Sequence, residues 1–199
     1  MPLPPRWSRH SGDDASSGRS RDLIPTPFGG RSGYDEPMAK RNYLVEGGSG
    51  TGKSSVCREL RKRGYKAIDG DNELAYQGDP DTGKRTEGHS YEHHIWDVDR
   101  VREIAASEEE EVALFCGGSR NFHKFLDIFD KVIVLDVDTE TLKQRLAGRA
   151  ADDWGGNDKE KEKILRLHAT KEGIPKGMVI DTARPLNEVV DSIVKCIEA

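Results

Sequence analysis

A glycine-rich octapeptide, Gly47 to Ser54, constrains this chain more than any other feature of its 199 residues. It reads GGSGTGKS and fits the pattern G-x-x-x-x-G-K-[ST], which belongs between a strand and a helix. The apolar run Tyr43 to Val45 precedes it, and an amphipathic stretch that begins near Lys53 follows it. The chain must therefore contain a strand that ends in a tight glycine turn and continues as a helix.

This strand–turn–helix arrangement predicts a phosphate-binding loop. Glycines let backbone N–H groups turn inward around phosphate oxygens, and the helix N-terminus adds partial positive charge. Lys53 would reach the outer phosphates, and the Ser54 hydroxyl would ligate Mg²⁺. A glycine-rich turn without chemistry is the alternative. We expect a nucleoside triphosphate to contact Gly47, Gly48, Ser49, Gly50, Thr51, Gly52, Lys53, Ser54 and Ser55.

From residue 41 onward, short β-rich runs alternate with longer helical stretches. The runs are Asn42–Glu46, Lys66–Asp69, Val112–Phe115, Val132–Val137 and Met178–Asp181. Apolar spacing predicts helices between them, including one over 92–106 and a terminal one from Pro185 that carries an apolar stripe. Strands that alternate with helices predict an α/β fold, in which a parallel sheet is covered on both faces.

Composition separates residues 1–37 from the rest of the chain. This segment holds six of the nine prolines, six serines and five glycines. It predicts a disordered N-terminal tail or extension, and Met38 resembles an internal start, so we expect one domain over 38–199. No apolar run approaches the roughly 18 residues needed to cross a bilayer.

Charge and cysteine content exclude several classes of partner. The chain carries 31 Lys and Arg against 36 Asp and Glu, a net charge of −5. Neither nucleic acid nor a membrane is an expected partner. Three cysteines without a C-x-x-C pair argue against a disulfide scaffold or a thiolate zinc site. We expect a cytoplasmic protein, and its oligomeric state stays open.

Two further strand ends carry polar or glycine-rich residues. Asp69-Gly70-Asp71 follows the second strand, and Gly117-Gly118-Ser119-Arg120 follows the third. The carboxyl ends of parallel strands open on the edge that holds the phosphate loop. There Asp71 would orient an acceptor hydroxyl, and Asp69 would hold a metal-bound water. The alternative for this pair of aspartates is a polar turn that caps a helix.

In this order of motifs, the chain resembles the shikimate kinase and nucleoside or nucleoside-monophosphate kinase branch of phosphate-loop kinases. The resemblance covers about residues 41–197. It implies a three-layer P-loop NTPase fold with a five-stranded parallel sheet in the order 2-3-1-4-5 and a short lid. It also implies that Asp69 lies near the magnesium, that Asp71 binds the acceptor hydroxyl, and that Gly117 and Gly118 line the acceptor site. Asp136, at the fourth strand, is the alternative metal-side carboxylate, and the strand order favours Asp69.

The resemblance extends to the lid and the adenine site. Arg145 and Arg149 fall near the end of a helix, and the glycine-bracketed stretch 150–157 follows them. The resemblance implies that Arg145 packs on adenine, that Arg149 reaches the phosphates, and that Pro185 borders adenine. The spacing of Arg149 departs from the shikimate kinase pattern. The alternatives are solvated charges at a helix end and an ordinary helix start.

Charge predicts the chemistry of the acceptor. Between Asp69 and Asp99 there are nine Asp or Glu against two Lys or Arg, so this region repels anions. Where the resemblance would place an arginine for the shikimate carboxylate, the chain has His93-His94. We therefore expect Arg120 and the glycine pair to line a site for a nucleoside, or for a sugar-like or amino-alcohol metabolite. A nucleoside monophosphate is the second choice.

These observations together predict a small-molecule kinase that uses ATP and Mg²⁺. Lys53, Asp71 and Arg149 are the candidate catalytic residues. One rival is a non-catalytic, ATP-dependent regulatory module, and another is a kinase that acts on a macromolecular end. His89, His93 and His94 suggest a metal site, because His89 and His93 have i, i+4 spacing. No fourth soft ligand is near, so contacts to the acceptor or a solvated helix start are preferred.

Overall fold

The computed structural model describes residues 40–107, 109–151 and 153–198. The predicted tail over 1–37 lies outside these residues. The unit that contains them, Pro37–Ala199, is described here by itself. Among the described residues, no helix combines the length and the apolar character that a membrane span requires.

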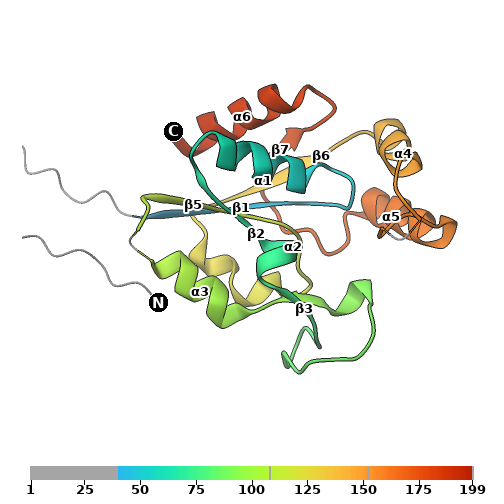
Figure 1. Ribbon diagram of the computed structural model, residues 1–199, viewed down its shortest axis with the longest axis horizontal. Coiled ribbons are helices and arrows are strands. Elements are labelled where there is room, and N and C mark those ends of the chain that lie inside the picture. The colour runs from blue at the N-terminus through green and yellow to red at the C-terminus, as the bar shows by residue number, and fades with distance from the viewer. Residues whose placement is uncertain (1–39, 108, 152, 199) are drawn as a thin grey trace, which may run out of the picture. The chain divides into compact units, whose positions relative to one another are not determined.

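A five-stranded sheet forms the centre of this unit (Figure 1). Its strands are β1 (Arg41–Gly47), β2 (Lys66–Asp69), β5 (Val112–Cys116), β6 (Lys131–Asp136) and β7 (Met178–Asp181). Their order is β2-β5-β1-β6-β7, and every neighbouring pair is parallel. Counted along this sheet alone, that is the order 2-3-1-4-5, so the predicted fold class is confirmed.

Both faces of the sheet are buried, as the apolar strands predict. On one face, alternate residues such as Tyr43 and Val45 pack against α1 (Lys53–Lys62) and α6 (Leu186–Glu198). On the other face, Leu44 packs with Phe115 against residues of α3 (Val98–Ala106) and the loop that contains Phe125. Figure 1 shows α1 and α6 on one side of the strands and α3 on the other. The result is three layers.

The helices begin where the local sequence favours it. The Asp138 side chain accepts a hydrogen bond from Thr141 N at 2.9 Å and caps α4 (Thr139–Ala147). Asn157 caps α5 (Asp158–Thr170) through Glu160 N. Pro185 precedes α6, and its carbonyl accepts from Glu188 N, so the proline serves as a helix start. Helices α4 and α5 enclose the predicted lid segment.

The segment between β2 and α3 differs from the prediction. A helix was expected over 92–106, but α3 begins only at Val98, after Asp97 caps it by accepting from Arg100 N at 3.0 Å. Residues His94–Trp96 instead form β4, which pairs antiparallel with β3 (Ala75–Gln77). Burial of Ile95 and Trp96 in the sheet-side core outweighs their helical spacing. Between the two strands stands a short 3₁₀ helix, Tyr91–His93.

Parallel strands bring the functional loops to one edge. The loop after β1, the turn after β2 and the glycine pair after β5 all leave the carboxyl ends of the sheet. The short helix α2 (Gly70–Glu73) carries Asp71 directly after β2. A Cβ on Gly70 would lie 2.1 Å from the Trp96 ring, so only glycine lets β2 turn into α2 here.

Candidate active site

The glycine loop after β1 has the backbone that the octapeptide predicts. Gly50 and Gly52 have φ angles of 88° and 102°, in the left-handed region that glycine favours. A side chain at Gly50 would also place its Cβ 2.6 Å from Leu142. The loop therefore curls tightly and delivers the chain to the N-terminus of α1, where unpaired N–H groups and the helix dipole favour an anion.

Lys53, the first residue of α1, folds back over this loop. Its Nζ donates to Gly47 O at 2.7 Å and to Gly48 O at 3.1 Å. The ammonium is thus held at the mouth of the loop, where the outer phosphates of a bound nucleotide would lie. Ser54 is exposed one residue further on. The loop and both side chains line a cavity of about 680 Å³, which we call the larger cavity.

Two arginines line the larger cavity and contact the phosphate loop. Arg145 donates from Nη1 to Gly50 O at 3.1 Å, and from Nη2 to Thr182 O at 2.5 Å. Arg149 donates from Nη1 to Ser49 Oγ at 3.0 Å and also to Trp154 O in the lid. Burial lowers the pKa of Arg149 from its ordinary value. The structure thus brings both predicted arginines to the phosphate loop.

The predicted adenine contact has a different outcome. Thr182, Arg184, Leu186 and Val189 line the larger cavity, whereas Pro185 is not part of its lining. Leu186 is 40% exposed, so an apolar side chain faces this end of the cavity. A contact between Pro185 and adenine stays a prediction.

A second cavity of about 400 Å³, the smaller cavity, lies on the other side of Lys53. Asp71 reaches it from α2, and its Oδ1 accepts from Gly118 N at 3.1 Å and lies 3.2 Å from His94 Nε2. Burial alone would raise the pKa of Asp71. The hydrogen bond to His94, the charge of Lys53 and the Gly118 N–H together hold this pKa below its ordinary value. Asp71 is therefore an ionised carboxylate that faces both cavities.

The glycine pair after β5 makes room for the acidic side chains. A side chain at Gly117 would place its Cβ 2.8 Å from Asp71 Oδ1, and one at Gly118 would place it 2.9 Å from Glu46 Oε1. Arg120 follows the pair, donates from Nη1 to Tyr91 Oη at 2.6 Å, and lies over the Tyr91 ring at 4.4 Å. Of the three residues expected to line the acceptor site, Gly118 and Arg120 line the smaller cavity. Gly117 is not part of its lining and lies next to Asp71.

Glu46 is the site residue that the sequence analysis missed. It is the residue before the phosphate loop, it is 1% exposed, and its side chain lines the smaller cavity. Neither carboxylate oxygen has a hydrogen-bond partner among the residues that the structure describes. Burial raises the pKa of Glu46 to about 7, against the opposing charges of Lys53 and Arg120. The available signal was a glutamate directly after the apolar run Tyr43–Val45.

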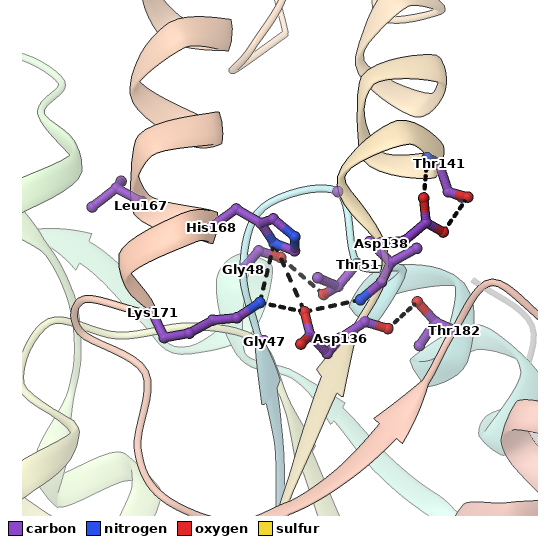
Figure 2. Close-up of polar contacts among 12 residues, drawn as sticks. Gly47, Gly48, Thr51, Asp136, Asp138, Thr141, Leu167, His168, Lys171 and Thr182 are labelled. Carbon is purple, nitrogen blue, oxygen red and sulfur yellow. Dashed lines mark hydrogen bonds and ion pairs between the residues drawn. The ribbon is translucent and has the colours of Figure 1, made fainter.

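The two candidate metal-side carboxylates are both engaged. Asp69 Oδ2 accepts from Asn72 Nδ2 at 2.9 Å, and Asp69 is not part of the lining of either cavity. Asp136 Oδ1 accepts from Lys171 Nζ at 2.6 Å and from Val137 N at 2.9 Å (Figure 2). Burial would raise the pKa of Asp136, but these two contacts lower it overall. The lysine ammonium already occupies the Asp136 carboxylate.

The described residues offer few ligands for a magnesium ion. In the ranges 40–107, 109–151 and 153–198, no group of three His, Cys, Asp or Glu side chains is placed to hold a metal. His89 and His94 line the smaller cavity without forming such a group. The exposed Ser54 hydroxyl fits Mg²⁺ that is carried mainly by nucleotide phosphates and water. The roles of Ser54 and Asp69 toward the metal stay predictions.

The lid contacts the segment that borders the smaller cavity. Trp154 stacks on Tyr91 with ring centroids 5.9 Å apart and an interplanar angle of 11°. Lys163 Nζ lies 5.2 Å from the Tyr91 centroid and 6.0 Å from that of Trp154, and it forms an ion pair with Glu92. Because Trp154 lines both cavities, the lid covers the place where they meet.

Comparison with known proteins agrees with this geometry. Residues 44–166, more than half of the chain, match the sequence model of a family described as AAA domain. The comparison with curated proteins gives no match.

Solved structures of small-molecule kinases share the fold. Shikimate kinase from Acinetobacter baumannii in complex with shikimate is 19% identical with a TM-score of 0.54, over 80% of this chain and 94% of that one. A gluconokinase from Sinorhizobium meliloti 1021 is 20% identical with a TM-score of 0.50, over 78% and 90%. An unliganded sugar kinase from Janibacter sp. HTCC2649 is 17% identical with a TM-score of 0.50, over 80% and 95%. At these identities the likeness establishes the fold.

Proposed function

The chain belongs to the AAA domain family, and from this premise we propose that it transfers the γ-phosphoryl group of Mg-ATP to a hydroxyl group of a small molecule. The family and the phosphate loop imply nucleotide binding. The kinase fold and the second cavity favour transfer to an acceptor over hydrolysis or simple binding.

One observation carries this proposal. Lys53 and Asp71 line both the larger and the smaller cavity, so the two cavities meet at a lysine and an ionised aspartate. A triphosphate along the loop would bring its terminal group to Lys53, and a hydroxyl in the smaller cavity would lie beside Asp71. The donor phosphate and the acceptor hydroxyl would then lie next to each other at these two residues, as direct transfer between them requires.

The phosphate loop would supply most of the electrostatic stabilisation. Backbone N–H groups from Gly47 to Ser55 would hold the phosphates, and Lys53 would leave its two carbonyl partners to reach the transferred group. Ser54 would hold the magnesium, which would neutralise charge that develops on the phosphates during transfer. We keep Asp69 as the carboxylate that acts on this ion through water, because Asp136 carries Lys171.

Asp71 would orient the acceptor. Its pKa lies below the ordinary value, so it is ionised at neutral pH and accepts a hydrogen bond from the hydroxyl that attacks. His94 and Gly118 N fix the carboxylate before any acceptor arrives. Phosphoryl transfer proceeds through a loose transition state, so positioning contributes more than strong basicity.

The lid arginines would complete the donor side. Arg149 reaches Ser49 and Arg145 reaches Gly50, so both guanidinium groups lie against the loop that holds the phosphates. Fixed positive charge near the transferred group stabilises the transition state, and a closed lid excludes water. Arg145 and Pro185 are the proposed adenine-side contacts.

The acceptor we propose is a neutral or cationic hydroxyl compound, such as a nucleoside or a sugar-like or amino-alcohol metabolite. Glu46, Asp71 and Glu160 line the smaller cavity, and once Lys53 is bound to phosphates, Arg120 is the remaining Lys or Arg of its described lining. This balance disfavours a second phosphate. A nucleoside monophosphate is the weaker candidate.

Replacement of the loop lysine tests the activity. We expect Lys53→Ala to lower acceptor-dependent ADP release by at least about 100-fold, as loss of a preorganised charge contact does. The acceptors would be nucleosides, monophosphates, shikimate, gluconate and amino alcohols. Lys62→Ala is the matched control, because Lys62 lies on the same helix with its side chain 76% exposed.

Two outcomes would contradict the proposal. Near-normal turnover by Lys53→Ala would remove the role assigned to the loop. Tight binding of Mg-ATP with no release of ADP that any acceptor stimulates would favour the regulatory module. Turnover confined to monophosphates would reverse the order of the two acceptor classes.

A further inference from the structure

A buried carboxylate that accepts no hydrogen bond from the described residues is part of the lining of the smaller cavity. Glu46 is 1% exposed, and neither Oε1 nor Oε2 has a hydrogen-bond partner within the described part of the chain. Buried acceptors of this kind are rare in folded proteins, because leaving one unpaired costs about 1–3 kcal/mol. The proposed phosphoryl transfer assigns no role to this side chain. Glu46 therefore points to a ligand that donates hydrogen bonds.

The neighbouring arginine is incompletely paired as well. Arg120 donates from Nη1 to Tyr91 Oη, and its Nη2 lies 4.0 Å from Glu46 Oε1. Its Nε is buried and has no partner among the residues described. The Arg120 side chain is 14% exposed and lines the same cavity as Glu46. The wall thus carries two unpaired acceptors and one unpaired donor.

This combination selects among ligand charges. An anionic group would pair with Arg120, but it would be repelled by the ionised Asp71 and would have no proton to donate to the Glu46 oxygens. An ammonium group would pair with Glu46, but it carries donors only and would leave the Arg120 Nε without an acceptor. A hydroxyl both donates and accepts, so two neighbouring hydroxyls can donate to both Glu46 oxygens while one of them accepts from Arg120 Nε.

We propose that Glu46 and Arg120 bind two neighbouring hydroxyl groups of an uncharged polyol, which the proposed kinase then phosphorylates at another hydroxyl beside Asp71. The inference rests on the proposed function for the transfer step, but the binding site stands on the unpaired atoms alone. The inference narrows the proposed acceptor to neutral diols. It excludes the cationic compounds and the nucleoside monophosphates that the proposed function left as candidates.

The glycine pair supports this separation of roles. Gly118 lies between the two carboxylates, since its N–H donates to Asp71 and its Cα faces Glu46. The two acidic groups therefore flank one turn without sharing a hydrogen bond. Asp71 would contact the reacting hydroxyl, and Glu46 would be a specificity-determining residue that contacts the other two.

Matched acceptors test the charge rule on the unaltered protein. Glucose, gluconate and glucosamine present one carbon skeleton as a neutral, an anionic and a cationic compound, and adenosine and 2′-deoxyadenosine differ by one hydroxyl of a diol. Binding would be measured by calorimetry in the presence of a non-hydrolysable ATP analogue, and turnover by ADP release. We expect neutral diols to bind and the charged or deoxy member of each pair to bind at least about tenfold more weakly.

Glu46→Gln tests the residue. Loss of a hydrogen bond to a charged group should raise KM for a neutral diol by about 10- to 100-fold, with kcat and ATP affinity little changed. On the deoxy acceptor, the same substitution should raise KM less, because one of the two partner hydroxyls is already missing. Glu140→Gln, an exposed surface glutamate, is the control.

The outcomes separate the inference from the proposed function. Stronger binding of gluconate or glucosamine than of glucose, or no binding of any neutral diol, overturns the inference and leaves the kinase proposal to the Lys53 test. A fall in kcat at unchanged KM for Glu46→Gln overturns it too, because Glu46 would then act on the reacting group. Binding of neutral diols that depends on Glu46, without turnover of any acceptor, keeps the site and overturns the kinase proposal.

Discussion

Glu46 combines deep burial with nearby charge of both signs. Burial is the largest influence on its pKa, while Lys53 and Arg120 favour the ionised form and Asp71 disfavours it. The net effect raises the pKa from an ordinary value near 4.5 to about 7. The folded protein therefore binds a proton at Glu46 that the unfolded chain releases, and stability depends on pH through this one group.

The sign of this dependence gives a prediction for the protein without ligands. As pH rises from about 4.5 to 7, the unfolded carboxyl ionises and the buried one does not, so folding loses up to about 3 kcal/mol and then levels off. Glu46→Gln carries no titrating group there. Between pH 4.5 and 7, the free energy of unfolding should therefore fall less for Glu46→Gln than for the wild type.

Urea denaturation at pH 4.5, 6 and 7.5 measures the difference. Glu140→Gln, which replaces an exposed side chain, should track the wild type at all three pH values. Parallel curves for the wild type and Glu46→Gln would show that burial does not raise the pKa of Glu46.

The functional roles of residues inside a sequence motif could be predicted, but those of residues just outside a motif could not. The phosphate-loop motif requires glycine and lysine at set positions, because the tight backbone turn needs glycine and the bound phosphates need the Lys53 ammonium. Glu46 lies one position before that pattern, and only burial gives it meaning. Asp136 matches a metal-binding strand in sequence, yet a lysine 35 residues later occupies its carboxylate, and no local pattern announces that contact.

At the scale of elements, the lid closes by a contact between aromatic rings. Trp154 of the segment between α4 and α5 stacks on Tyr91 of the segment between β3 and β4, and Lys163 of α5 lies over both rings. The ion pair of Lys163 with Glu92, together with a hydrogen bond from Ser90, lowers the pKa of Glu92 to about 2. These contacts join the lid to the wall of the smaller cavity.

Removal of the stack should loosen the lid. An aromatic pair contributes about 0.5–1.5 kcal/mol beyond its buried area, so Trp154→Ala should raise ATP hydrolysis in the absence of acceptor by about two- to tenfold. Trp154→Phe keeps a ring and should stay near the wild type. The measurement is ADP release without acceptor, with ATP affinity followed in parallel.

A lid that closes in another way would behave differently. Equal hydrolysis by Trp154→Ala and the wild type would show that the stack does not control access of water. A loss of ATP affinity as large as the gain in hydrolysis would point to the contact of Arg149 with Trp154 O instead.

Element boundaries were predictable where a cap or a turn residue decides them. Pro185 was expected to begin the last helix, and it does precede α6, because a proline in the first turn needs no N–H partner. Asp138 starts α4 by an equally local device, a side-chain cap. The helix expected over 92–106 begins only at Val98, so its predicted start was wrong, because His94–Trp96 pairs with a strand about 20 residues earlier. Such pairing depends on tertiary contacts, which helical spacing alone does not reveal.

At the scale of the whole molecule, the sheet order followed from the succession of strands and loops. Apolar strands separated by helices require a parallel sheet, and the resemblance to phosphate-loop kinases supplied the order. The shape of the smaller cavity was not predictable, because its lining comes from segments that are far apart in the sequence, between Glu46 and Ile174. Their convergence depends on the turn at Gly70 and on the hairpin that carries His94.

The whole-molecule prediction concerns residues 1–37, which we propose lie outside the folded domain. The apolar clusters of the described residues run from Tyr43 to Ile197, and the end of α6 is tied to β1 because the Arg41 and Tyr43 side chains donate to Ile197 O. A chain of residues 38–199 keeps all of these groups. We expect its melting temperature to lie within about 2 °C of the full chain, because no core packing is removed. Its ATP affinity should equal that of the full chain.

A deletion at the other end serves as the contrast. Removal of residues 186–199 should abolish cooperative unfolding, because it uncovers the sheet face on which α6 packs. A fall of many degrees for residues 38–199 would place part of the first 37 residues in the core.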